Sequence, residues 1–333
     1  MANSLESFTA EFRKALSLFQ RVIITTHMNP DGDGLGSELA VYSLIKKLGK
    51  EVLILNSDPV PENYKFLCEY APYTLCNENE PLLESDIVVI LDISTLERLG
   101  TMSNLVSSAP SKKICIDHHA SNSGFADLNY IDSKASSTGE LVYRIAKSMN
   151  IEIDKNAALG IYTAILTDTG AFKYSNTTSE VHRITAEMIE IGVSPDFVYS
   201  KIYEQKSEER MRLLGEVLTN IQSMCGGRIV WSEVTLEMRK KENVEYEETD
   251  GFIDQLGFIG DIEIYLLFLE RDDGKIKVSL RSKNDFDVNK FAKKFNGGGH
   301  SHAAGILLEG NLEDVKNKIL SSLKNDIEIS SRK

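Results

Sequence analysis

Short apolar segments alternate with helix-like segments in the first half of the chain, and this alternation constrains the fold more than any other feature. The apolar runs expected to be strands lie at residues 22–26, 51–55, 86–91 and 113–116. Helical patterns lie at about residues 37–48, 138–149 and 155–167, and a glycine-rich loop is expected just before the first of them. Strands and helices that alternate in this way predict an α/β domain with a mainly parallel sheet.

The second half of the chain has a different pattern. A charged stretch at about 195–224 is helical in pattern, and we expect it to be a connecting helix that ends at the glycines after Cys225. Strand-like segments then precede helices expected at 288–295 and 312–324, and the sequence Asp-Asp-Gly at 272–274 predicts a hairpin turn. The expected division is an α/β domain over residues 1–190, a helical linker over 191–225 and a smaller α+β domain over 226–333.

Acidic and imidazole side chains follow three of the four strands predicted in the first half. Because ligands of an open parallel sheet bind beyond the carboxyl ends of its strands, we expect these side chains to gather at one edge of the sheet. In chain order they are His27, Asp31 and Asp33 after the first strand, Asp92 after the third, and Asp117, His118 and His119 after the fourth, with Asp168 following the helix at 155–167.

The residue types in these groups suit a pair of metal ions. Two divalent cations about 3.5–4 Å apart can clamp a phosphoryl group and activate a water molecule. Asp31 and Asp33 are separated by Gly32, so a turn can aim each at a different cation, and Asp92 is a candidate for the bridge. Mixed carboxylate and imidazole ligands favour Mn²⁺ over a structural zinc site, which would use cysteine.

Each of these pieces also has a purely structural explanation. A single aspartate after a strand is most often a turn residue or a helix cap. The segment 30–34 (PDGDG) could be a turn, or half of a calcium loop that lacks the later bidentate glutamate. Adjacent histidines after an aspartate are harder to explain in this way. The four groups taken together therefore favour a metal centre.

Charge and composition exclude several classes of partner. The net charge of −13 argues against binding to duplex DNA. No apolar run approaches the roughly 20 residues that span a bilayer, and the N-terminal segment lacks the apolar core of a signal peptide. The four cysteines, none of them spaced as CxxC, indicate reduced thiols. We therefore expect a cytoplasmic protein with no membrane partner.

These motifs resemble those of the DHH phosphoesterase superfamily. Residues 27–37 (HMNPDGDGLGS), the isolated Asp92, the Asp117-His118-His119 triplet and Asp168 in TDTG are similar to its four motifs. Residues 296–305 (NGGGHSHAAG), preceded by 279–282 (SLRS), resemble the signature of the DHH-associated C-terminal substrate domain. The size and layout of the chain resemble the stand-alone, NrnA-type members, which act as nanoRNases and as 3′-phosphoadenosine-5′-phosphate (pAp) phosphatases.

The resemblance implies a site with two manganese ions, for which Mg²⁺ or Co²⁺ could substitute. Asp117 would orient a histidine without binding a metal itself. His119 would contact the substrate phosphate or donate a proton. One metal would be held by His27, Asp31 and Asp92, and the other by Asp33, Asp92, His118 and Asp168.

A second group of residues is expected to contact the substrate. Consecutive glycines let backbone N–H groups approach a phosphate closely, although a flexible loop is the alternative. Arg281, at the end of a strand, could donate two hydrogen bonds to a phosphate. Arg98, which follows Asp92, could reach over the site or be a surface charge. Residues 136–140 (SSTGE) are expected to cap a helix, which would also offer N–H groups to an anion. The substrate candidates are Arg98, Arg281, Gly297, Gly298, Gly299 and His300.

The resulting hypothesis is a two-domain phosphoesterase with its active site in the cleft between the domains. It would hydrolyse short oligoribonucleotides to 5′-mononucleotides and convert pAp, a mononucleotide bisphosphate, to AMP. Hydrolysis of a cyclic dinucleotide such as c-di-AMP, or of pyrophosphate, remains an alternative, and so does a non-catalytic nucleotide sensor. The complete set of candidate ligands argues against a sensor. A homodimer is compatible with the apolar parts of the first domain, but no sequence feature locates an interface.

Overall fold

The chain divides into two compact units, Met1–Gln205 and Lys206–Lys333. The computed structural model describes residues 4–77 and 86–330. Each unit has its own six-stranded sheet and its own hydrophobic core. Among the described residues, no helix combines the length and the apolar composition needed to cross a bilayer.

A parallel sheet forms the centre of the first unit, as the alternating sequence pattern predicts. The strand order is β3-β2-β1-β4-β5-β6, and all neighbouring strands are parallel. The chain builds outward from β1 in one direction and then from β4 in the other, so the order reverses between these two strands. Ligands bind at such a reversal in open α/β sheets. The strands are β1 (Arg21–Thr25), β2 (Glu51–Asn56), β3 (Tyr73–Leu75), β4 (Ile87–Leu91), β5 (Lys112–Asp117) and β6 (Leu128–Ile131).

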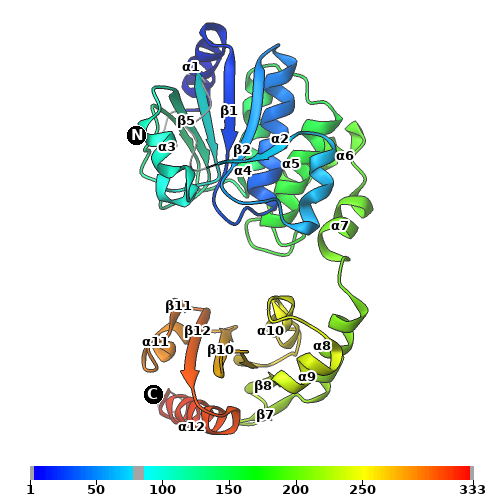
Figure 1. Cartoon of the computed structure of the whole chain (residues 1–333), viewed down its shortest axis with the longest axis vertical. Coiled ribbons are helices and arrows are strands. Elements are labelled where there is room, and N and C mark those ends of the chain that lie inside the picture. Colours follow the sequence, from blue (N-terminus) through cyan, green and yellow to red (C-terminus); the bar gives the residue numbers. More distant parts are fainter. Residues whose placement is uncertain (1–3, 78–85, 331–333) are drawn as a thin grey trace. The chain divides into compact units, whose positions relative to one another are not determined.

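Helices cover both faces of this sheet (Figure 1). Successive residues of a strand point to opposite faces, so Val22 and Ile24 join the larger core, whereas Ile23 joins a smaller core with Met102 and Val106 of α3. The larger core contains the apolar sides of α1, α2, α4 and α5. The helices are α1 (Leu5–Leu18), α2 (Gly32–Lys47), α3 (Met102–Ser108), α4 (Thr138–Ser148), α5 (Lys155–Asp168), α6 (Ser179–Ile191) and α7 (Pro195–Tyr203), with the 3₁₀ helices η1 (Glu62–Glu69) and η2 (Leu96–Leu99).

Helix α2 begins at Gly32, so the prediction of a loop before residue 37 is wrong. The side chain of Asp31 caps the helix by accepting hydrogen bonds from the backbone N–H groups of Asp33 and Gly34. The glycines serve close packing here. A Cβ on Gly36 would lie 2.5 Å from the carbonyl oxygen of Gly160, and a Cβ on Gly160 would lie 2.3 Å from that of Gly36. Helices α2 and α5 therefore touch backbone to backbone.

The second unit contains a mixed sheet of order β11-β12-β10-β9-β8-β7, in which only β8 and β9 pair in parallel. The predicted hairpin at 272–274 is confirmed, because β9 and β10 are antiparallel neighbours. The strands are β7 (Gln222–Met224), β8 (Ile229–Val234), β9 (Ile264–Glu270), β10 (Lys275–Ser282), β11 (Gly298–His300) and β12 (Ala303–Glu309). The helices are α8 (Glu208–Thr219), α9 (Leu236–Glu242), α10 (Phe252–Leu256), α11 (Val288–Lys293) and α12 (Leu312–Ser330), with the 3₁₀ helix η3 (Glu247–Thr249).

The stretch at 195–224, expected as one connecting helix, contains α7, α8 and β7. Helix α7 ends at Tyr203, and Ser207 starts α8 by accepting a hydrogen bond from the backbone N–H of Arg210 at 3.1 Å. Two glutamates in the first turn of α8 complete a typical helix start. The boundary between the units falls in the break between these helices.

Candidate metal centre

Six predicted ligands meet at the carboxyl ends of the parallel strands. His27 follows β1, Asp92 follows β4 and His118 follows β5, while the other three ligands, all aspartates, come from helix ends. Asp31 caps α2, Asp33 lies in its first turn, and Asp168 is the last residue of α5. The contact between α2 and α5 thus brings two of these carboxylates to the strand ends.

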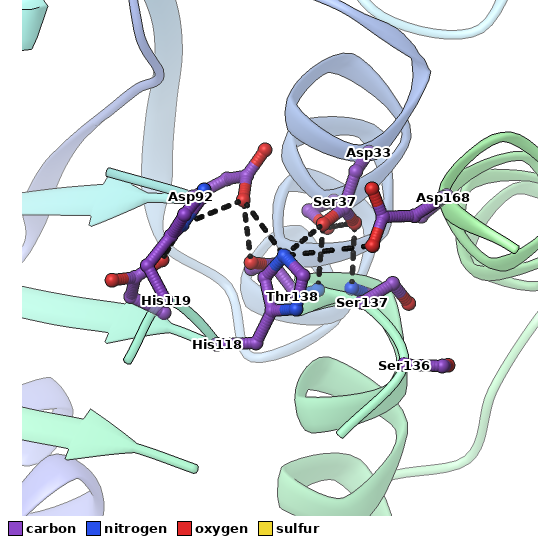
Figure 2. Close-up of polar contacts among 12 residues, drawn as sticks. Asp33, Ser37, Asp92, His118, His119, Ser136, Ser137, Thr138 and Asp168 are labelled. Atoms are coloured by element: carbon purple, nitrogen blue, oxygen red, sulfur yellow. Dashed lines mark hydrogen bonds and ion pairs between the residues drawn. The ribbon is translucent and has the colours of Figure 1, made fainter. Parts of the chain in front are cut away.

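The six side chains form two clusters that share Asp92. In the first cluster, Nε2 of His27 lies 3.7 Å from Oδ1 of Asp31 and 3.5 Å from Oδ2 of Asp92. In the second, Nε2 of His118 lies 3.5 Å from Oδ1 of Asp92. The same nitrogen lies 3.6 Å from Oδ2 of Asp33 and 3.6 Å from Oδ2 of Asp168. Figure 2 shows His118 with Asp92 on one side and these two aspartates on the other.

These distances fit cation binding better than direct hydrogen bonding. Hydrogen bonds between nitrogen and oxygen are usually 2.7–3.2 Å long. Two ligands that are each about 2.1 Å from one cation lie roughly 3–3.5 Å apart. The donor atoms of His27, Asp31 and Asp92, and those of Asp33, His118 and Asp168, each lie within 4.8 Å of one another. The residues present therefore suit one divalent cation in each cluster.

The N-terminus of α4 holds the carboxylate of Asp33. Backbone N–H groups of Thr138 and Gly139 donate to its two oxygens at 2.7 and 3.0 Å, and the hydroxyl of Ser37 donates at 3.3 Å (Figure 2). The sequence at 136–140 predicts this helix start and its affinity for an anion. It does not reveal that the anion is a carboxylate of the chain itself.

Asp92 is fixed in a backbone conformation with positive φ. Its φ is 59°, its side chain is buried, and its backbone N–H donates to the carbonyl of Ile116 at 3.1 Å. The hydroxyl of Thr138 donates to Oδ1 of Asp92 at 3.2 Å. Aspartate and asparagine tolerate positive φ better than most residues. This conformation lets the side chain leave the end of β4 with one oxygen toward each cluster.

Asp117 and His119 form a pair beside the two clusters. Nδ1 of His119 lies 2.7 Å from Oδ1 of the fully buried Asp117. The amide of Asn122 donates to the other oxygen of Asp117 at 2.8 Å and so fixes its orientation. The His119 side chain is half-exposed, and Nδ1 is the ring nitrogen that contacts Asp117. Asn122 was not among the predicted residues, and only its closeness to the Asp-His-His triplet points to it.

Several carboxyl groups are crowded together in the centre. Burial, and next the charges of Asp92 and Asp168, raise the pKa of Asp33 well above its usual value. Burial also raises the pKa of Asp168 to about 6, although His118 acts in the opposite direction. Carboxylates crowded in this way repel one another and are stabilised by a bound cation.

Cation binding is expected to release protons, with an affinity that increases with pH. Burial works to lower the pKa of His27, but the carboxylates of Asp31 and Asp92 outweigh it and raise this pKa to about 10. A coordinating imidazole must be neutral. At pH 8 the cation must therefore displace a proton from His27, and the apparent affinity increases as the pH approaches 10. Calorimetric titration with Mn²⁺ in two buffers of different ionisation enthalpy measures this release, and equal heats in both would contradict it.

The predicted substrate residues lie in both units. Arg98 lies in η2 with an exposed side chain, and its carbonyl accepts a hydrogen bond from Met28, the residue after His27. In the second unit, Arg281 and Gly298 line one pocket of about 580 Å³. Lys277, Ser279 and Gly305 line the same pocket. Lys277, Arg281 and the glycines could contact a phosphate, although Glu247 and Asp250 line the same pocket and balance its two positive charges.

The glycines at 297–299 have different roles in the structure. A Cβ on Gly297 would lie 2.3 Å from the carbonyl oxygen of Gly305, and one on Gly299 would lie 2.3 Å from that of Ala303. A Cβ on Gly298 would meet no atom within 4 Å. The outer two glycines thus allow backbone segments to pack closely, and Gly298 leaves open space in the pocket. His300 is the exposed end residue of β11.

Family models match a segment in each of the two units. The model of the DHH family, N-terminal domain, matches residues 21–165, and that of the DHHA1 domain matches residues 226–328. A curated relative from Thermus thermophilus, named bifunctional oligoribonuclease and PAP phosphatase NrnA, is 30% identical over 92% of this chain and 90% of its own. A relative of the same name from Bacillus subtilis is 28% identical over 94% of this chain and 97% of its own.

A solved structure has the same fold as this chain. The crystal structure of an exopolyphosphatase-related protein from Bacteroides fragilis is 30% identical and matches with a TM-score of 0.85 over 96% of both chains. This chain and these relatives share family matches, near-complete coverage and a common fold, which indicates common ancestry. The chain belongs to the DHH family of phosphoesterases, with a DHH domain followed by a DHHA1 domain.

Proposed function

We propose that this protein hydrolyses short oligoribonucleotides to 5′-mononucleotides and converts pAp to AMP, at a centre that holds two divalent cations. The observation that carries the proposal is the carboxylate of Asp92, whose two oxygens face two separate histidine–aspartate clusters. The names of the two curated relatives supply the substrate class. Mn²⁺ is the proposed metal, because the ligands mix carboxylate with imidazole.

The proposed ligands fall into two sets. When bound, a pair of divalent cations polarises a phosphoryl group, lowers the pKa of a water molecule and orients the two for in-line attack. The chain's contribution is to hold the ligands in place, through the α4 N-terminus for Asp33 and through Thr138 for Asp92. One set is His27, Asp31 and Asp92, and the other is Asp33, Asp92, His118 and Asp168.

His119 is the proposed contact to the scissile phosphate or its leaving group. A hydrogen bond with Asp117 raises the pKa of His119 more than burial lowers it. This shift favours the protonated ring, in which both nitrogens carry a hydrogen. With Nδ1 occupied by Asp117, Nε2 can donate to a phosphate oxygen or protonate a departing hydroxyl.

The second unit is the proposed binding site for the part of the substrate away from the scissile phosphate. Arg281 and Gly298 line its pocket, Lys277 adds a second positive charge, and Glu247 and Asp250 add two negative ones. A pocket for one phosphate or nucleoside would favour short substrates, which need no extended basic channel. The net charge of −13 is compatible with such substrates.

Replacing Arg281 with alanine is expected to raise KM with little effect on kcat. A hydrogen bond to a charged group contributes about 1.5–3 kcal/mol, so the loss corresponds to a roughly 10- to 100-fold higher KM. Lys283→Ala is the matched control, since its amine donates to the carbonyl of Ile259 and does not line the pocket. Steady-state kinetics with pAp measure both variants. A collapse of kcat at constant KM would instead place Arg281 at the chemical step.

The substrate proposal is tested by turnover of metal-stripped protein with Mn²⁺, Mg²⁺ or Co²⁺ added back. The panel contains pAp, a 5′-phosphorylated diribonucleotide, c-di-AMP, pyrophosphate and a short polyphosphate, which the name of the Bacteroides fragilis protein suggests. AMP from pAp, and mononucleotides from the dinucleotide, are the expected products. Turnover of only c-di-AMP, pyrophosphate or polyphosphate would overturn the substrate class. No turnover of any compound would overturn the enzyme proposal.

A further inference from the structure

A left-handed turn follows the proposed ligand Asp168. Gly170, Ala171 and Phe172 have φ values of 56°, 56° and 66°. Residues with a Cβ rarely adopt this conformation, and two such residues in succession require support from their surroundings. Thr169 supplies it, because its hydroxyl accepts a hydrogen bond from Phe172 and its carbonyl accepts hydrogen bonds from Lys173 and Tyr174. The chain therefore reverses sharply within a few residues of the metal centre.

The turn lays the ring of Tyr174 back over Gly170. A Cβ on Gly170 would lie 2.5, 2.5 and 2.8 Å from three neighbouring atoms of this ring. Such similar distances place the glycine against the face of the ring. Position 170 thus requires glycine both for its φ and for its contact with Tyr174.

The end of the turn is bound to two segments of the metal centre. The side-chain amide of Asn176 donates to the carbonyl of Asp168 at 3.1 Å and to that of Ser136 at 3.0 Å. Ser136 lies just before the helix α4 that holds Asp33. Tyr174 is therefore on a segment anchored directly at a proposed ligand.

Packing holds Phe172 inward, whereas Tyr174 packs on Gly170 and otherwise lies largely outside the core. The Phe172 ring lies 6.3 Å from that of Tyr162 and 5.4 Å from that of His182, and so anchors the turn inward. Tyr174 is 57% exposed. One side of its ring rests on a glycine, and a large part of the remainder faces solvent. Aromatic rings presented in this way stack on the unpaired bases of single-stranded nucleic acid.

We propose that Tyr174 is a specificity residue that stacks on the base of the nucleotide whose phosphate lies at the metal centre. This inference rests on the proposed function, because it assigns a contact within that site. Stacking accepts every base, since each has a flat face. Substrates should therefore be distinguished by the presence of a base and only weakly by its identity.

The test compares substrates with and without a base in matched variants. Tyr174→Ala is expected to raise KM for pAp about 5- to 100-fold, from the usual effect of losing one stacked base. For ribose 3,5-bisphosphate, which lacks the base, its KM should stay within about twofold of wild type. Tyr174→Phe should behave as wild type with both compounds. Tyr199→Ala is the control, as Tyr199 is 43% exposed in α7 and its ring packs on Tyr203.

The alternative outcomes are separable from failure of the proposed function. If Tyr174→Ala raises KM equally for both compounds, Tyr174 acts only by supporting Asp168. If KM is unchanged for both, Tyr174 does not contact the substrate. Tyr174→Leu, which still covers Gly170, replaces the alanine variant if that one unfolds. If wild type turns over neither compound, the proposed function fails. Calorimetric binding of AMP and ribose 5-phosphate then makes the same comparison, and an equal loss of affinity for both overturns the stacking proposal.

Discussion

Asp92→Asn is expected to reduce turnover about 1000-fold or more while the protein stays folded. The reason is that both oxygens of Asp92 are used, one in each cluster, and a neutral amide cannot supply two anionic ligands. Losing the cation pair removes several kcal/mol of transition-state stabilisation, and each 1.4 kcal/mol is a factor of ten in rate. Asparagine tolerates the φ of 59° at this position, so the backbone should be unchanged. Turnover of the diribonucleotide and of pAp is the measurement.

A control separates this effect from the loss of any carboxylate. Asp127 is exposed, and it accepts a hydrogen bond from the backbone N–H of Lys113 near the start of β5, away from the metal centre. Asp127→Asn should keep turnover within about twofold of wild type. Normal turnover of Asp92→Asn would remove Asp92 from the bridging position.

Gly160→Ala is expected to destabilise the first unit strongly and to weaken cation binding. The new Cβ would lie 2.3 Å from the carbonyl oxygen of Gly36 and 2.8 Å from the backbone nitrogen of Ala40. Neither backbone atom can move without shifting α2. Overpacking of this kind costs about 3 kcal/mol, which lowers Tm by roughly 6–12 °C in a unit of this size. Asp33 and Asp168 lie on the two helices that would separate, so the affinity for Mn²⁺ should fall as well.

Gly215→Ala is the matched control for this variant. Gly215 lies within α8 of the second unit, and a Cβ there would meet no atom within 4 Å. Alanine in an open helical position stabilises by about 0.4–1 kcal/mol. Thermal unfolding followed by circular dichroism should show a lower midpoint for Gly160→Ala and an unchanged or higher one for Gly215→Ala. Equal midpoints would mean that α2 and α5 adapt without cost.

The gathering of the proposed ligands could be predicted because it follows from local patterns. His27, Asp92 and His118 each come directly after an apolar strand, and parallel strands end at one edge of a sheet. That rule needs only the positions of the strands along the sequence. The hairpin at 272–274 was predictable for the same reason, since a turn signal lies between two strand patterns.

The support around the ligands could not be predicted, because it depends on contacts between distant segments. Thr138 holds Asp33 across 105 positions of the chain, and no local pattern encodes that meeting. The glycines of α2 have low helix propensity, so they indicated a loop. Only the close approach of Gly160 explains why Gly36 lies in a helix. Strands β3 and β6 were missed because three or four residues are too few to show a period.

The roles of the three glycines in the second unit also depend on contacts with distant segments. The sequence predicts a single phosphate site at Gly297, Gly298 and Gly299. The structure distinguishes them by what a side chain would meet, and only Gly298 faces open space in the pocket. A run of identical residues carries no signal that could separate backbone packing from ligand access.

The central claim is that two cations lie in the first unit and share Asp92. Anomalous diffraction from crystals grown with Mn²⁺ tests it most directly. The account predicts two anomalous peaks about 3.5–4 Å apart, one beside His27 and Asp31 and the other beside His118 and Asp168, with Asp92 contacting both. A single peak, or two peaks of which only one contacts Asp92, would contradict it.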